Sequence, residues 1–189
     1  MAKVKNNIVT QGLSGTLGNT LVFRQYKGTT VAATKSVSRK EPSGEQLKHR
    51  QRFQEAVIYS KSQMADPEAK AEYEARKGDS TAFLVAVADF FHAPDIVSVD
   101  LSDYEGQPED RIVVRVTDDF RVMWVKIQIF TADGNLLEEG NATLGNNGLD
   151  WVYQAREVNA NPEGDRIVVQ AGDKPGNITQ EGVEGNPVR

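Results

Sequence analysis

The chain has 189 residues, of which 39% are apolar and 26% are charged, and this composition is typical of one large or two small globular domains. It contains no cysteine, which excludes a disulfide framework, a thiol nucleophile and any cysteine-ligated metal site. The only histidines are His49 and His92, so a three-histidine metal site is excluded as well.

The net charge of −5 is distributed unevenly along the chain. Residues 1–52 carry ten basic and two acidic side chains, a net charge of +8, whereas the remaining residues carry 12 basic and 25 acidic side chains, a net charge of −13. A basic front part is expected to attract polyanions or acidic surfaces. The alternative is that the two oppositely charged parts attract each other, within one chain or between copies.

Residues 1–41 are predicted to form a small, basic β-hairpin arm. Two runs rich in β-branched and aromatic residues, Thr20–Tyr26 and Thr29–Thr34, flank Lys27-Gly28. A two-residue connection that ends in glycine is typical of a hairpin. Because a lone hairpin is only marginally stable in water, we expect the arm to dock on the body of the protein or on another molecule.

Residues 42–94 are predicted to form a helical segment of three short helices. Ser43 and Gln46 have the spacing of a capping box, in which each residue bonds the backbone N–H of the other. Asp66-Pro67 is a second start signal, with an N-cap followed by proline at the first helical position.

The third helix is expected over Thr81–Phe91, capped by Asp79 or Ser80. It is apolar almost all round, and such a helix is expected to be buried, either inside the domain or in an interface between chains.

From Ile96 onward the apolar residues alternate with polar ones, which predicts strands. Six or seven short strands separated by turn residues predict an antiparallel β-sandwich over residues 95–177 and a flexible tail over residues 178–189. The predicted fold class is therefore α+β. Trp151 lies in a short predicted strand and is expected in the sandwich core. The strands are predicted in Ile96–Leu101, Ile112–Val116, Val122–Phe130, Asn135–Glu139 (extended by Ala142–Leu144), Leu149–Gln154 and Ile167–Ala171.

The C-terminal half resembles cysteine-free immunoglobulin-like or fibronectin-type-III-like modules of bacterial proteins. The residues that carry the resemblance are the strand Val122–Ile129, the turn Asp133-Gly134-Asn135, the strand Trp151-Val152-Tyr153 and the closing segment Ala171–Asn177. The resemblance implies a β-sandwich and implies no activity, because sandwiches host unrelated functions.

The front half is similar to small uncharacterised bacterial and phage-type proteins, a resemblance that implies no activity. The residues that carry it are Leu17-Gly18-Asn19, Val22–Gln25, Gly28–Val31, Gln51-Arg52-Phe53, Ala56-Val57 and Tyr59.

No arrangement of residues in the sequence indicates catalysis. No nucleophile or orienting acid accompanies His49, and neither a G-x-S-x-G nor an H-E-x-x-H motif occurs. We expect no enzymatic activity, no cofactor, no metal and no small-molecule substrate. The residues predicted to bind a partner are the basic side chains of the arm, Arg24, Lys27, Lys35, Arg39 and Lys40.

These features favour a structural or assembly protein, such as a subunit of a phage-like or other multiprotein particle. It would dock through its basic N-terminal part onto a protein partner or another copy and display the sandwich. The alternative is a nucleic-acid-associated protein that binds through residues 1–52. The N-terminus shows no secretory signal and no apolar run is long enough to span a membrane, so we expect a cytoplasmic protein that can be incorporated into a particle.

Overall fold

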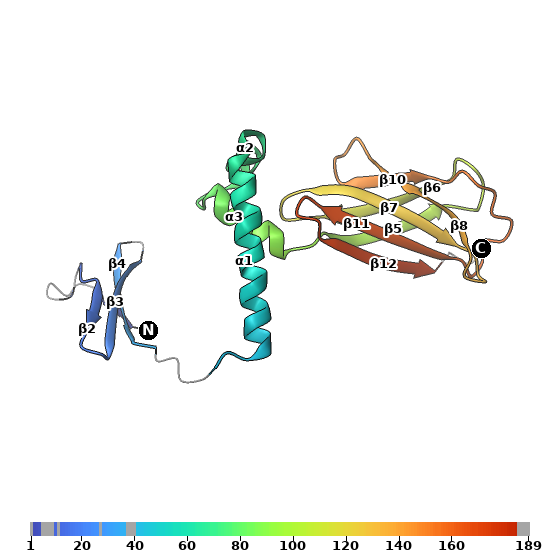
Figure 1. The fold of residues 1–189 in the computed structure, drawn as a ribbon. Coiled ribbons are helices and arrows are strands. Elements are labelled where there is room, and N and C mark those ends of the chain that lie inside the picture. Colours follow the sequence, from blue (N-terminus) through green and yellow to red (C-terminus); the bar gives the residue numbers. More distant parts are fainter. Residues whose placement is uncertain (1, 5–9, 11, 27, 37–40, 185–189) are drawn as a thin grey trace. The chain divides into compact units, whose positions relative to one another are not determined.

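The computed structural model describes residues 2–4, 10, 12–26, 28–36 and 41–184, and their architecture is α+β (Figure 1). The chain divides into two compact units, residues 1–48 and residues 49–189. An antiparallel sheet lies in the first unit, and two more follow the helices in the second. The predicted fold class is confirmed. None of the described helices is both long and apolar enough to cross a membrane.

The N-terminal unit contains the predicted hairpin, extended on both sides to a four-stranded antiparallel sheet. Its strand order is β1-β4-β3-β2. Gly28 adopts φ +74° directly before β4, a conformation that glycine reaches without steric cost. The strands are β1 (Ala2–Val4), β2 (Gly15–Leu17), β3 (Leu21–Tyr26) and β4 (Thr29–Thr34).

The first helix, α1 (Gly44–Ala65), begins at the predicted capping box. The backbone N–H of Ser43 donates to Oε1 of Gln46 at 3.1 Å, and the backbone N–H of Gln46 donates to Oγ of Ser43 at 3.3 Å. This reciprocal pair satisfies backbone donors that the helix itself leaves without partners.

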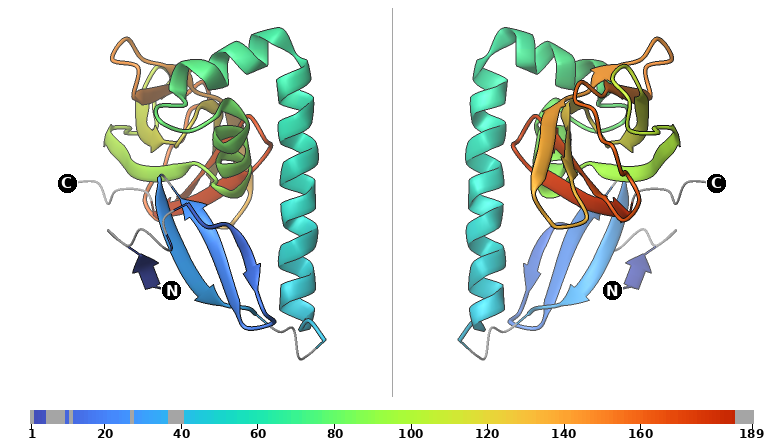
Figure 2. Two further views of the ribbon diagram at one scale, coloured as in Figure 1. Left: turned by 90° about the vertical axis from the view of Figure 1, so that its left-hand side faces the viewer. Right: turned by 90° about the vertical axis from the view of Figure 1, so that its right-hand side faces the viewer.

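The second helix, α2 (Pro67–Arg76), begins at the predicted Asp66-Pro67 signal. The carboxylate of Asp66 accepts from the backbone N–H groups of Glu68 and Ala69. Proline disfavours the helical conformation in the residue before it, so α1 ends here and α2 leaves it at a steep angle (Figure 2).

The third helix, α3 (Ala82–Phe91), is capped by Thr81, whose hydroxyl accepts from the backbone N–H of Leu84 at 3.2 Å. The predicted cap at Asp79 or Ser80 is wrong because Ser80 belongs to the preceding turn, where its N–H bonds the carbonyl of Lys77. Within one chain this helix is buried on one side: Ala86 is fully buried, whereas Leu84 is 55% exposed. Burial of the exposed side in an interface between chains stays a prediction.

The two C-terminal sheets form the predicted sandwich around one core. The first sandwich sheet has the order β5-β6-β10-β9 and the second sandwich sheet the order β12-β11-β7-β8. Fully buried side chains of both sheets, such as Ile112 and Ile127, meet in the core. The strands are β5 (Asp95–Asp103), β6 (Arg111–Thr117), β7 (Val122–Phe130), β8 (Leu136–Asn141), β9 (Thr143–Leu144), β10 (Asp150–Gln154), β11 (Arg166–Asp173) and β12 (Ile178–Glu184).

Two predictions for this region differ from the structure. Ala142 continues the pairing just beyond β8, since its N–H donates to the carbonyl of Val125 in β7 at 2.8 Å, but Thr143 and Leu144 form β9, which pairs with β10 in the other sheet. The first part of the predicted flexible tail is a strand over Ile178–Glu184, which pairs antiparallel with Arg166–Gly172 of β11, and residues 185–189 lie outside the described residues. This edge strand is mostly polar and contains Gly182, so its sequence lacks the apolar alternation that identifies a half-buried strand.

Trp151 is half-buried and packs against the rim of the sandwich core, whereas Tyr153, two residues later on the same face of β10, is 1% exposed. The prediction of a core residue is therefore correct for one side of the Trp151 ring only. The same side chain lines a pocket described below.

The close approach of Trp124 to Gly172 predicts a specific stability defect. A Cβ atom at Gly172 would lie 2.3 Å from the indole ring, so Gly172→Ala must displace the ring and should lower the free energy of unfolding by roughly 1–3 kcal/mol. Urea denaturation measures the loss. Gly44→Ala is the matched control because nothing lies within 4 Å of its added Cβ. Equal stability of Gly172→Ala and wild type would contradict the packing described here.

Candidate functional site

The predicted partner-binding residues lie in the N-terminal unit, and the structure describes two of them. Arg24 is exposed in the middle of β3, opposite Val31. Lys35 lies beyond the far end of the same hairpin, where its Nζ donates to Oδ1 of Asn19 at 3.1 Å. The two cations are therefore not brought together. Lys27, Arg39 and Lys40 lie outside the described residues.

One face of the N-terminal sheet carries exposed apolar side chains at one end. The strand register places Leu17 opposite Leu21, with Phe23 on the same face. Leu17 is 63% exposed. At the other end of this face, Gln25 donates to the carbonyl of Leu13 and to Oγ1 of Thr30, so a short loop folds over the sheet. Thr30 is the only buried side chain among the described residues of this unit.

The opposite face of the sheet combines a cation with an aromatic ring. Arg24 and Tyr26 are two residues apart in β3 and therefore point to the same side. Tyr26 is 67% exposed. The sequence showed this alternation, and the sheet shows that Arg24 and Tyr26 are both exposed on it.

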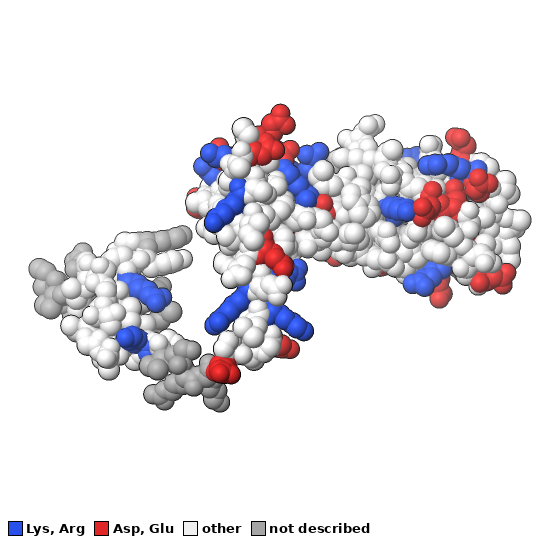
Figure 3. Space-filling model, in the orientation of Figure 1, with Lys and Arg blue, Asp and Glu red and all other residues white. Residues whose placement is uncertain are grey.

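The basic residues that follow in α1 are partly engaged with aromatic rings. The guanidinium of Arg52 lies 5.5 Å from the centre of the Phe91 ring, and His49 and Phe53 stack on the same ring. Blue side chains project from this part of α1 in Figure 3.

In the second unit, a buried polar cluster joins the helices to the sandwich. Asp89 of α3 is 2% exposed and accepts a hydrogen bond from the hydroxyl of Tyr73 in α2. That hydroxyl also bonds the hydroxyl of Tyr59 in α1 at 2.8 Å. From the sandwich, the side-chain amide of Asn177 donates to the carbonyls of Phe90 and His92 at the end of α3.

Charged residues surround this cluster. Glu72 of α2 accepts from Nζ of Lys174 at 2.5 Å and from the guanidinium of Arg121 at 3.2 Å. Lys174 also lies over the rings of Tyr73 and Phe120, which stack on each other with centres 4.1 Å apart. The hydrogen bond from Lys174 holds the pKa of Glu72 below its usual range.

Burial raises the pKa of Asp89 to about 6, and the nearby carboxylates of Asp118 and Asp173 act in the same direction. Oδ1 of Asp89 is buried and has no hydrogen-bond partner among the described residues. Burial likewise raises the pKa of Asp173. The ionised form of Asp89 is therefore costly at this position.

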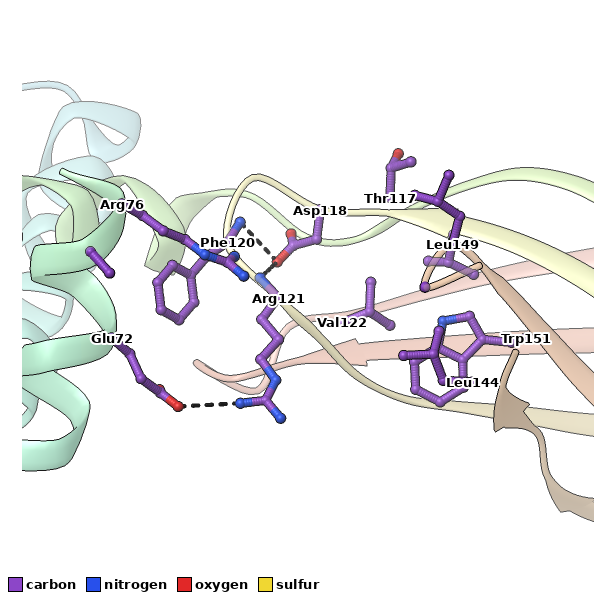
Figure 4. Close-up of a pocket in the computed structure, with 13 residues that line it drawn as sticks. Glu72, Arg76, Thr117, Asp118, Phe120, Arg121, Val122, Leu144, Leu149 and Trp151 are labelled. Atoms are coloured by element: carbon purple, nitrogen blue, oxygen red, sulfur yellow. Dashed lines mark hydrogen bonds and ion pairs between the residues drawn. The ribbon is translucent and has the colours of Figure 1, made fainter. Parts of the chain in front are cut away.

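Next to this cluster, residues of α2 and of one end of the sandwich line an open pocket of about 630 Å³ (Figure 4). Trp151, Leu144 and Leu149 line one side, and the pairs Arg76–Phe120 and Arg121–Glu72 line the other. On this rim, Oδ2 of Asp118 accepts from the backbone N–H groups of Phe120 and Arg121, whereas its buried Oδ1 has no hydrogen-bond partner among the described residues.

Acidic side chains serve turns rather than a metal centre in the described part of the chain. Asp100 accepts from the backbone N–H of Ser102, and Asp119 pairs with His92. No group of three or more potential ligands is arranged to hold a metal ion among the described residues. Comparison of the chain with protein-family models, with curated proteins and with solved structures finds no match.

The buried position of Asp89 predicts a pH-dependent stability. Its pKa is about 6 in the folded protein and near the ordinary 3.8 in the unfolded chain, so the folded state binds the proton more tightly. The contribution of this tighter proton binding to the free energy of unfolding is complete below about pH 4 and is lost as the pH rises through about 6. As the pH rises from about 4 to about 6, the free energy of unfolding of Asp89→Asn should therefore increase by about 1–3 kcal/mol relative to that of wild type.

Urea denaturation of both proteins across this pH range measures the difference. Asp133→Asn, at an exposed turn, is the matched control. Parallel stability curves for wild type and Asp89→Asn would show that the Asp89 carboxylate is solvated.

Proposed function

We propose that this protein is a non-enzymatic assembly protein that docks through its N-terminal sheet and displays the C-terminal sandwich. The observation that carries the proposal is how little the four-stranded sheet of the N-terminal unit buries: among its side chains whose burial the structure describes, only that of Thr30 is buried.

A sheet of this kind needs a partner for stability. Ordering the backbone costs about 1–2 kcal/mol per residue, and apolar burial must offset that cost. The exposed leucines Leu13, Leu17 and Leu21 supply the apolar surface that a partner would cover.

The charge of the chain favours a second copy as that partner. Residues 1–48 carry eight basic and two acidic side chains, and residues 49–189 carry 14 basic and 25 acidic ones. Each copy thus offers both a basic sheet and an acidic surface. Contacts between unlike surfaces of identical chains build rings or filaments, which are the subunit arrangements of particles.

The strand order supports the resemblance of the displayed sandwich to immunoglobulin-like modules. In those modules the first, second, fifth and fourth strands form one sheet, and the third, sixth and seventh form the other. The strands β5, β6, β10 and β9 share the first arrangement, and β7, β11 and β12 share the second, with β8 added at the edge. A sandwich of this kind is a rigid unit for display in a phage-like particle assembled in the cytoplasm.

The alternative function is binding of nucleic acid through residues 1–52. It is favoured by one observation, the exposed Tyr26 beside Arg24 on one face of the sheet, because single strands bind to aromatic rings flanked by cations.

The assembly proposal predicts that Leu17→Asp weakens self-association at least 10-fold, since burial of one leucine contributes about 1.5–3 kcal/mol. Sedimentation velocity over a concentration series measures the effect. Thr16→Asp introduces the same charge at the neighbouring, exposed position on the opposite face and should associate like wild type. A wild-type protein that remains monomeric at all concentrations refutes self-assembly.

The nucleic-acid alternative predicts a different result. Wild type would then bind random-sequence single-stranded DNA with an affinity that falls steeply with salt, and Arg24→Glu together with Lys35→Glu would flatten that dependence. Fluorescence anisotropy at several salt concentrations measures it. If the double variant binds the DNA with the same affinity and the same salt dependence as wild type, Arg24 and Lys35 are not part of a nucleic-acid interface.

A further inference from the structure

The outer face of the second sandwich sheet carries planar side chains that lie flat on the strands. The indole of Trp124 lies directly on the backbone of Gly172, and the guanidinium of Arg166 lies on that of Gly182, 3.0 Å from the position a Cβ would take. Both glycines have φ outside the left-handed region, so no turn requires them. Because glycine has no side chain, Gly172 and Gly182 let the indole of Trp124 and the guanidinium of Arg166 lie directly on the backbone.

Between these groups, side-chain hydrogen bonds fix a row of amides and a carboxylate across the strands. Gln128 of β7 donates to Glu139 of β8 at 2.9 Å, and Glu139 also pairs with Lys126 at 2.8 Å. Gln170 of β11 donates to Gln180 of β12 at 2.9 Å. These polar groups are therefore held in place before any ligand arrives.

The same face is hollowed at one end into an open pocket of about 670 Å³. Its lining includes the ring of Phe130, the side chains of Gln128, Gln180 and Arg166, and the backbone of Gly182. Trp124 and Phe130 are six residues apart in β7 and thus about 20 Å apart along one face. The aromatic rings flank a polar strip that is long enough for an extended oligomer.

The charges of this face are balanced. Lys126 forms an ion pair with Glu139, and Arg166 lies opposite Glu184 in the strand register. Figure 3 shows blue and red side chains interspersed over the sandwich. A polyanion is disfavoured here because residues 49–189 carry a net charge of −11.

We propose that the outer face of the second sandwich sheet, from Trp124 to Phe130, binds a neutral oligosaccharide. The hydroxyl groups of a sugar are both donors and acceptors, which matches the amide row, and its apolar C–H faces match the indole of Trp124, which lies flat on the strands. This inference does not depend on the N-terminal sheet and goes beyond the assembly function, since it concerns what the displayed sandwich recognises.

The test uses the full-length protein and a panel of neutral hexasaccharides: cellohexaose, laminarihexaose, mannohexaose, maltohexaose and chitohexaose. Isothermal titration calorimetry should show saturable binding of at least one of them with a Kd of about 1 mM or lower. Gln128→Ala and Gln180→Ala should each raise the Kd for that hexasaccharide about 3- to 10-fold, the usual effect of losing one hydrogen bond.

Two controls make the result specific. Gln154→Ala removes an exposed glutamine from the other sheet and should bind like wild type, as should Leu17→Asp in the N-terminal unit. Circular dichroism confirms that each variant is folded. The proposal is overturned if no hexasaccharide binds, or if one binds and the Gln128 and Gln180 variants retain full affinity. Loss of assembly in Leu17→Asp with intact sugar binding would separate the two functions.

Discussion

The arrangement of the second unit depends on the side-chain amide of Asn177. Its two N–H groups face the carboxylate of Asp173 in β11, at 2.7 Å, and the carbonyls of Phe90 and His92 at the end of α3, at 3.2 Å each, which share the second hydrogen. The last carbonyls of a helix have no partner within the helix, so an external donor satisfies them. One residue between β11 and β12 thus terminates α3 and ties it to the sandwich.

This tie places a polar cluster where an apolar core would otherwise be expected. Because α3 is fixed against the sandwich, Asp89 is buried among Tyr73, Asp118 and Asp173, and its pKa rises. Buried ionisable groups cost stability unless they are fully paired. We therefore expect the junction between helices and sandwich to be sensitive to pH. The sandwich core itself is mainly aliphatic, with the buried rings of Tyr104 and Tyr153 at its edge beside the carboxylates of Asp165 and Glu138.

The two units differ in how they obtain stability. The second unit buries aliphatic residues from both of its sheets, such as Val114 and Val169, so it has its own core. The sheet of the first unit leaves Leu17 and Tyr26 largely exposed. This contrast is the physical argument behind the proposal that the first unit docks and the second is displayed.

The sequence by itself determined the local elements whose signals are local. The capping box of Ser43 and Gln46, the Asp66-Pro67 start and the strand Val122–Phe130 follow from neighbouring residues, and the structure has them as predicted. Only the tertiary structure showed the strand Ile178–Glu184, because a polar edge strand is defined by its pairing with β11 rather than by its own pattern. The same holds for the flat face at Trp124 and the burial of Asp89, since both depend on residues distant in sequence, Gly172 and Tyr73, that only folding brings into contact.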